Sequence, residues 1–147
     1  MTPTIRIQTD DFDAARETEL LAQTAPGAIA TFTGFVRAEA GLTSLTLEHY
    51  PGMTEGEIAR HIEAAGRRWP LTGVTVIHRV GELKPGERIV LVAVAAQHRR
   101  EAFATCEFLM DHLKHTAPFW KSERKFGATH WVEVKPSDAE AAERWKK

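Results

Sequence analysis

The sequence has a single cysteine, Cys106, and this scarcity excludes an internal disulfide. It contains no apolar run near the roughly 20 residues that a helix needs to cross a bilayer. Its first residues, MTPTIRIQTDDF, lack the apolar stretch of a signal peptide. We therefore expect a cytoplasmic protein that makes no membrane contact and that is held together by its core.

The sequence also lacks an excess of charge of either sign. Lys and Arg number 19, Asp and Glu number 20, and the net charge is −1. General nucleic-acid binders usually carry a broad excess of Lys and Arg, so we expect no nucleic-acid partner and only a local cationic patch. No glycine-rich loop resembles a P-loop or a dinucleotide-binding fingerprint, so nucleotide-driven chemistry has no support.

What is present suits one compact domain. The chain has 147 residues, of which 43% are hydrophobic and 27% are charged, and it shows no internal repeat or low-complexity linker. A chain of this size can bury a core of its own. We therefore predict a single domain that spans residues 1–147.

Hydropathy patterning predicts a mixture of strands and helices. Strand patterns occur at residues 4–8, 28–36, 43–49, 74–80, 88–96, 119–120 and 129–134. Helical patterns occur at residues 11–23, 54–69, 100–115 and 137–145. The order β-α-β-β-α-β-β-α-β-β-α favours an α+β domain with a mixed sheet over a repeating βαβ fold. A short polar turn separates residues 28–36 from 43–49, so these two strands are predicted to pair as a hairpin.

The helix predicted at residues 54–69 has a clear start and a clear apolar face. Thr54 is followed by Glu57 at the third position, which is the spacing of a capping box. The apolar residues on one helical face are Ile58, Ile62, Ala65 and Trp69. This face is expected to pack on the core.

The strand predicted at residues 88–96 leads directly into the next helix. Its nearly continuous Val, Leu and Ala residues suit burial on both faces of a sheet. The apolar stripe of the following helix consists of Ala102, Phe103, Cys106, Leu109, Met110 and Leu113. On this stripe Cys106 is expected to be a buried small residue rather than a nucleophile.

Cationic side chains gather at both ends of this helix. They are His98, Arg99, Arg100, Lys114, His115, Lys121, Arg124 and Lys125. Such a set suits an anionic ligand, and a lysine among other cations can have a lowered pKa that permits proton or acyl chemistry. The leading hypothesis is therefore a site for a phosphorylated or carboxylated substrate. Arg37, at the exit of a predicted strand, is a further candidate for binding phosphate.

Each of these residues also has a structural explanation that the sequence leaves open. His98 and Arg99 can be solvated residues at a helix start, and Lys114 can simply interact with the dipole at a helix C-terminus. Lys121 can be an ordinary surface lysine, and Arg37 an ordinary strand-end residue.

The remaining histidines give weaker signals. His112 and His115 are spaced i, i+3, but no nearby carboxylate or cysteine completes a recognisable zinc site. His49 and His78 lie in strand patterns and are expected to be packed or hydrogen-bonded rather than catalytic. The sequence therefore predicts no metal and no cofactor.

Five segments of the sequence, taken together and in order, carry a family resemblance. They are FTGFVR at 32–37, LTLEHYPGM at 45–53, VTVIHRVGELKPGE at 74–87, HRREAF at 98–103 and MDHLKHTAPFWKSE at 110–123. Over roughly residues 28–134 the chain resembles the large, catalytic subunit of molybdopterin synthase. The resemblance leaves the tail after about residue 134 uncovered, and we expect this tail to be peripheral.

The resemblance implies a fold, an assembly and a reaction. The fold would be an α/β hammerhead with an additional mixed α/β subdomain. The assembly would be a central homodimer that binds a small ubiquitin-like subunit at each end, whose C-terminal Gly-Gly is activated as a thiocarboxylate. The reaction would transfer sulfur from two such thiocarboxylates to cyclic pyranopterin monophosphate and form the dithiolene of molybdopterin. Molybdenum enters the cofactor later, so the transfer itself would use no metal.

The resemblance also implies roles for particular residues. Lys114 and Lys121 match the catalytic lysines. The positions that match substrate-binding segments are Phe35, Val36, Arg37, His98, Arg99, Lys121, Ser122 and Glu123. Two other functions remain open from the sequence: a non-catalytic scaffold for a ubiquitin-like partner, and a module that binds a phosphorylated ligand without the small subunit.

Overall fold

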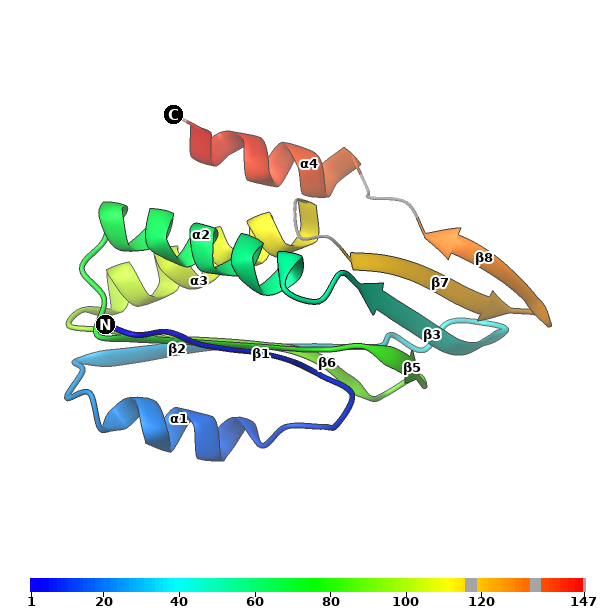
Figure 1. Ribbon diagram of the computed structural model, residues 1–147, viewed down its shortest axis with the longest axis horizontal. Helices are drawn as coiled ribbons and strands as arrows, with labels where there is room; N and C mark the ends of the chain where they lie inside the picture. Colours follow the sequence, from blue (N-terminus) through cyan, green and yellow to red (C-terminus); the bar gives the residue numbers. More distant parts are fainter. Residues whose placement is uncertain (116–118, 133–135, 147) are drawn as a thin grey trace.

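The computed structural model describes residues 1–115, 119–132 and 136–146. Within these residues it contains two four-stranded sheets and four α-helices. Figure 1 shows the larger sheet with one helix on one face and two on the other, and with the second sheet at one end. The α+β class predicted from the order of elements is confirmed.

The larger sheet has the strand order β1-β4-β6-β2. These strands are β1 (Thr4–Gln8), β4 (Gly73–Arg79), β6 (Arg88–Ala96) and β2 (Ala28–Phe35). β1 runs parallel to β4, whereas β6 is antiparallel to both of its neighbours. The strand that is most apolar in the sequence, β6, therefore lies in the interior of the sheet.

Helices cover both faces of this sheet. α1 (Ala14–Ala22) packs through Leu21 against Ala93 and Ala95 of β6. α2 (Met53–Arg68) and α3 (Arg99–His115) cover the opposite face, onto which β6 directs alternate residues such as Val92 and Val94. The predicted burial of β6 on both faces is thus confirmed, and this packing orients α3.

The second sheet has the strand order β5-β3-β7-β8 and is antiparallel throughout. Its strands are β5 (Gly81–Leu83), β3 (Leu42–His49), β7 (Phe119–Lys125) and β8 (Ala128–Val132). A small core beneath it consists of Val36, Leu45, Leu47 and Leu83. The partly buried Ile89 packs against this core and the main core, so the two sheets share a boundary.

The last described helix packs on the back of α3. α4 (Pro136–Glu143) is followed by a 3-10 turn, η1 (Arg144–Lys146), and Figure 1 shows both above α2 and α3. Trp145 donates a hydrogen bond from Nε1 to Asp111 of α3 at 2.6 Å and lies edge-on to Phe108. These contacts attach the C-terminal segment to the C-terminal half of α3.

The predicted hairpin between residues 28–36 and 43–49 is wrong. β2 pairs along its length with β6, and β3 lies in the other sheet between β5 and β7. A register shift between Gly34 and Phe35 and a hydrogen bond from Val36 N–H to Glu87 O keep the end of β2 beside β6. The apolar β6 needs a neighbour on each side, and this requirement outweighs the short connection between β2 and β3.

The predicted cap of α2 is also wrong. Gly52 is the N-cap residue, and its N–H donates to the side chain of Glu55 at 3.2 Å. Gly52 has a φ of 82°, a left-handed conformation that glycine adopts without strain. Thr54 is instead buried, and its hydroxyl donates to Tyr50 O at 3.0 Å.

The apolar stripe of α3 was predicted correctly except at two residues. Phe103 is 65% exposed, whereas Phe108, which was not assigned to the stripe, is buried. Phe103 is next to the buried Ala102, and one residue turns the side chain by 100° around the helix. That rotation places Phe103 at the edge of the buried face.

Other boundaries differ by a few residues. α1 begins at Ala14 after the cap residue Asp13, not at residue 11. The strand predicted at 119–120 extends to Lys125, and Gly81–Leu83 forms the unpredicted β5. Residues 133–134 of the last predicted strand lie outside the described part of the chain. No helix in that part is long and apolar enough to span a membrane.

Replacing Ile62 by Ala should lower the free energy of unfolding by roughly 2–5 kcal/mol, because Ile62 is 1% exposed between α2 and the sheet and its removal leaves a cavity. Urea denaturation followed by circular dichroism at fixed protein concentration measures this change. The matched control is Glu63→Ala, the next residue on α2, whose exposed side chain should change stability by less than about 0.5 kcal/mol. Equal losses in the two variants would contradict the packing described here.

Candidate functional site

A cavity of about 410 Å³ lies where the C-terminal end of α3, the larger sheet and the second sheet meet. Its polar lining residues are Arg37, Glu39, His78, Lys114, His115, Lys121, Glu123 and Ser137. Its apolar lining residues include Phe32, Met110, Leu113 and Phe119. The cavity therefore has both polar and apolar walls, and it is large enough for a small organic molecule.

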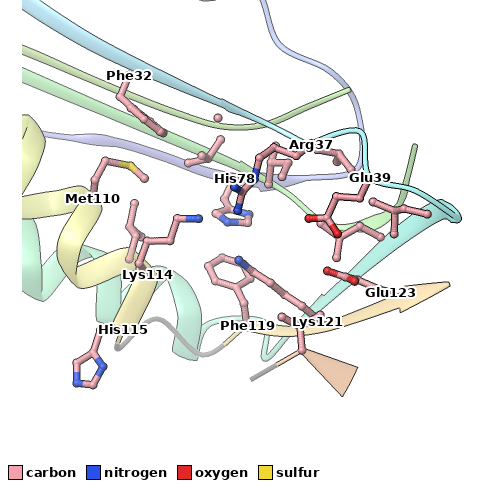
Figure 2. Close-up of a pocket in the computed structure, with 18 of the residues that line it drawn as sticks. Phe32, Arg37, Glu39, His78, Met110, Lys114, His115, Phe119, Lys121 and Glu123 are labelled. Atoms are coloured by element: carbon pink, nitrogen blue, oxygen red, sulfur yellow. The ribbon is translucent and has the colours of Figure 1, made fainter. Parts of the chain in front are cut away.

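Three cations reach this cavity from three distant segments. Arg37 follows β2, Lys114 lies in the last turn of α3, and Lys121 belongs to β7. In Figure 2 the terminal nitrogens of Lys114 and Lys121 point toward the same space, and Arg37 approaches it from the opposite side. Because these groups repel one another, an anion bound between them would be stabilised.

Strand geometry accounts for the placement of Lys121. Lys121 and Phe119 are two residues apart on β7, so their side chains project from the same face of the strand. Both residues line the cavity, as does Glu123 two residues further along. Ser122 has the opposite orientation and is not among the described residues that line the cavity.

The acidic side chains occupy one side of the cavity. In Figure 2, Glu39 and Glu123 lie together, away from Lys114. Lys125 Nζ is 2.7 Å from Glu39 Oε2 and 3.9 Å from Glu123 Oε2. The cavity thus has a cationic centre and an acidic edge that is paired with a further lysine.

His78 is a buried member of the site that reasoning from sequence did not assign to it. Its ring stacks on Phe119 with centroids 3.8 Å apart and an interplanar angle of 18°. Nδ1 lies 2.8 Å from Arg79 O. Burial, together with the charges of Lys121 and Lys114, lowers the pKa of His78 to about 3, so the imidazole is neutral near pH 7. The available signal was a histidine directly after the largely apolar run VTVI of a predicted strand.

Comparison with known proteins agrees with the family resemblance seen in the sequence, and the similarity extends along nearly the whole chain. The family model described as MoaE protein matches residues 7–116. The chain belongs to the MoaE family. A molybdopterin synthase catalytic subunit from Mesorhizobium japonicum is 52% identical to this MoaE family member over 99% of this chain and 95% of the relative. One from Ralstonia nicotianae is 50% identical over 97% of this chain and 84% of the relative.

Solved MoaE structures agree in fold. The molybdopterin biosynthesis MoaE protein from Burkholderia ambifaria has a TM-score of 0.87 at 48% identity, with 99% of each chain covered. Molybdopterin synthase from Staphylococcus aureus has a TM-score of 0.83 at 26% identity, covering 90% of this chain and 99% of that one. The function predicted from the sequence is confirmed: the catalytic subunit of molybdopterin synthase, a sulfurtransferase of molybdenum cofactor biosynthesis.

Not every residue predicted from the MoaE resemblance lines the cavity. Val36 is buried and lines it beside Arg37, whereas Phe35 is 52% exposed and lies outside it. His98 and Arg99 are exposed at the N-terminal end of α3. At 1.5 Å per residue, Arg99 lies roughly 22 Å along the helix from Lys114. One MoaE chain therefore does not bring His98 and Arg99 to its own lysines.

The other candidate groups lie away from this chemistry. Cys106 is buried in the main core as predicted, and burial raises the pKa of its thiol to about 11. Among the described residues, no group of three or more His, Cys, Asp or Glu side chains could hold a metal ion. His112 instead approaches Phe108 O at 2.9 Å through Nδ1.

His78 should make the protein less stable in acid. Between pH 6.5 and about 3 the unfolded chain binds a proton at this histidine that the folded chain excludes, so stability falls as the pH is lowered. This contribution is about 1.4 kcal/mol per pH unit. His78→Gln should remove it and give a shallower loss of stability below pH 6.5. Urea denaturation across this range tests the effect, with His130→Gln, at an exposed position on β8, as control. Parallel curves for wild type and His78→Gln would contradict the neutral imidazole.

Proposed function

We propose that this cavity is the active site, with Lys114 and Lys121 as the catalytic lysines and Arg37 as a ligand of the substrate phosphate. The reaction is sulfur transfer from the C-terminal thiocarboxylate of a small ubiquitin-like subunit to cyclic pyranopterin monophosphate. The observation that carries this proposal is the convergence of three cations on one cavity, from the segment after β2, from α3 and from β7. This cationic centre suits both anionic reactants.

The reaction needs charge stabilisation and proton transfer at neighbouring points. Arg37 can position the cyclic phosphate through charge-assisted hydrogen bonds. When sulfur attacks, a phosphate oxygen leaves, and an adjacent lysine ammonium can donate the proton that this oxygen requires. The same ammonium groups can stabilise the tetrahedral oxyanion that forms when water cleaves the acyl-sulfur bond. The remaining predicted contacts, Glu123 and the neighbouring Ser122, lie on β7 beside Lys121.

The small subunit would bind beside the second sheet, whose strand β7 lines the cavity. Large apolar residues are exposed there on β7 and β8: Trp120, Trp131 and Val132. A chain of the same fold occurs in the complex of subunits 1 and 2 of molybdopterin-converting factor from Helicobacter pylori, with a TM-score of 0.76 at 19% identity, covering 89% of this chain and 91% of that one. We accordingly propose that an extended Gly-Gly tail enters the cavity from this side.

The proposed homodimer accounts for the position of His98 and Arg99. These exposed residues begin α3, whereas Lys114 ends it, so a role at the same substrate requires that they come from a second copy of the chain. In that arrangement each cavity would be completed by its partner. We also propose that the fold is an α/β hammerhead in which the second sheet forms the added subdomain, and that the enzyme acts in the cytoplasm.

Lys114→Ala and Lys121→Ala should each lower the rate of single-turnover sulfur transfer by at least about tenfold, which is about 1.4 kcal/mol of transition-state stabilisation. The assay combines the protein, thiocarboxylated small subunit and cyclic pyranopterin monophosphate, and follows the product as its fluorescent oxidised pterin. Lys84→Ala is the control, because Lys84 is exposed in the turn after β5 and is not among the lining residues. Full turnover in both cavity variants would contradict the assignment of the lysines.

Mixing two inactive variants should restore activity if the site is shared between chains. Arg99→Ala and Lys121→Ala damage different halves of the proposed site, so a mixed dimer contains one intact site. After mixing under conditions that exchange subunits, we expect about a quarter of wild-type activity, because about half of the dimers are mixed and each has one of two sites. No recovery, despite mixed dimers demonstrated by mass spectrometry, would argue that each chain forms its site alone.

A further inference from the structure

His78 lines the cavity, and the hydrogen bond of its ring defines which ring nitrogen carries the hydrogen. Its Nδ1 lies 2.8 Å from the carbonyl oxygen of Arg79, and a carbonyl only accepts hydrogen bonds. The hydrogen of the neutral ring is therefore on Nδ1. Nε2 then carries a lone pair and acts only as an acceptor.

The ring is held in place by its neighbours. His78 is buried in β4, and Phe119 stacks on it almost in parallel at 3.8 Å. Phe119 and Lys121 project from the same face of β7, so the side chain of Lys121 starts next to this stack. Figure 2 shows the ends of Lys121 and Lys114 directed toward the space beside His78, and the charge of Lys121 acts on His78 more strongly than that of Lys114.

A neutral acceptor at this point differs from the acidic groups at the edge of the cavity. A carboxylate beside Lys121 would orient the ammonium but would also cancel its charge and repel an anionic substrate. An imidazole lone pair can help to orient the ammonium without cancelling any of its charge. Glu39 and Glu123 are the carboxylates among the described lining residues, and both lie near Lys125.

We propose that His78 is a positioning residue whose Nε2 accepts a hydrogen bond from the Lys121 ammonium and directs it into the cavity. This inference rests on the proposed role of Lys121. His78 itself need not touch the substrate, because it acts by restricting the orientations of a long, flexible side chain before sulfur transfer.

A double-mutant cycle tests the coupling between His78 and Lys121. His78→Phe keeps a ring against Phe119 but removes the acceptor, and it should lower the single-turnover rate about tenfold while changing half-saturation by cyclic pyranopterin monophosphate less than about threefold. In the Lys121→Ala background the same change should lower the rate by less than about twofold, because the lysine to be positioned is gone. His78→Gln, which retains an acceptor, should recover much of the rate.

The outcomes separate this inference from the proposal on which it rests. Full turnover in Lys121→Ala would overturn the role of the lysine itself. A loss in Lys121→Ala combined with independent, multiplying losses for His78→Phe would overturn the positioning role alone, as would a wild-type rate in His78→Phe. The matched control His61→Phe makes the same substitution between α2 and α3, away from the cavity, and should keep a rate near that of wild type.

A direct measurement keeps the inference testable even if His78→Phe does not fold. Nitrogen-15 NMR of histidine-labelled wild-type protein should show His78 neutral and protonated on Nδ1 from about pH 6 to about pH 8. The Nε2 resonance should shift in Lys121→Ala, because its hydrogen-bond donor is lost. A proton on Nε2, or a resonance that does not respond to loss of Lys121, would overturn the proposal.

Discussion

The burial of β6 on both faces is the constraint on which the rest of this structure depends. Leu91, Ala93 and Ala95 project from the face of the sheet that α1 covers. Val92 and Val94 project from the face that α2 and α3 cover. Such a strand is stable only in the interior of a sheet with helices above and below it. Because β6 leads directly into α3, the same packing fixes the axis of that helix. The 17-residue length of α3 then carries Lys114 to the boundary between the two sheets.

The cationic centre of the cavity carries an electrostatic cost in the absence of ligand. Arg37, Lys114 and Lys121 face a common space, so each destabilises the others. The negative end of the α3 dipole partly compensates the positive charge of Lys114. The side chain of Arg37 is exposed, so water screens its charge. The buried His78 adds no charge, because it stays neutral near pH 7. An anionic substrate would relieve the remaining repulsion, so the same charges that weaken the empty site favour its occupied state.

Local periodicity predicted most elements, but it did not predict how they pair. The bounds of β6 and the buried face of α2 follow from the spacing of their apolar residues, whichever elements they pack against. β2 and β3 separated into different sheets because strand partners are chosen by the whole core, which a local pattern does not contain. β7 was predicted too short because its residues after Trp120 are charged or polar. At the site, Lys114 and Lys121 were candidates because cationic side chains gather around α3, and the family resemblance predicted them as the catalytic lysines. His78 was not assigned to the site because its place there depends on a stack with Phe119, which is 41 positions away in the sequence.

The site lies between the larger sheet with its helices and the second sheet. Its geometry therefore depends on how these two parts pack together. Lys114 and His78 belong to the larger sheet and its helix, while Lys121 and Glu123 belong to the second sheet. Ile89 packs in both cores, and the stack of His78 on Phe119 crosses the same boundary. A small displacement of β7 would therefore change the spacing of the two lysines and the aim of Lys121 together. A protein that bound the exposed face of β7 and β8 would contact the element whose position sets the distance between Lys114 and Lys121. Such binding and the alignment of the two lysines would therefore be physically coupled in this fold.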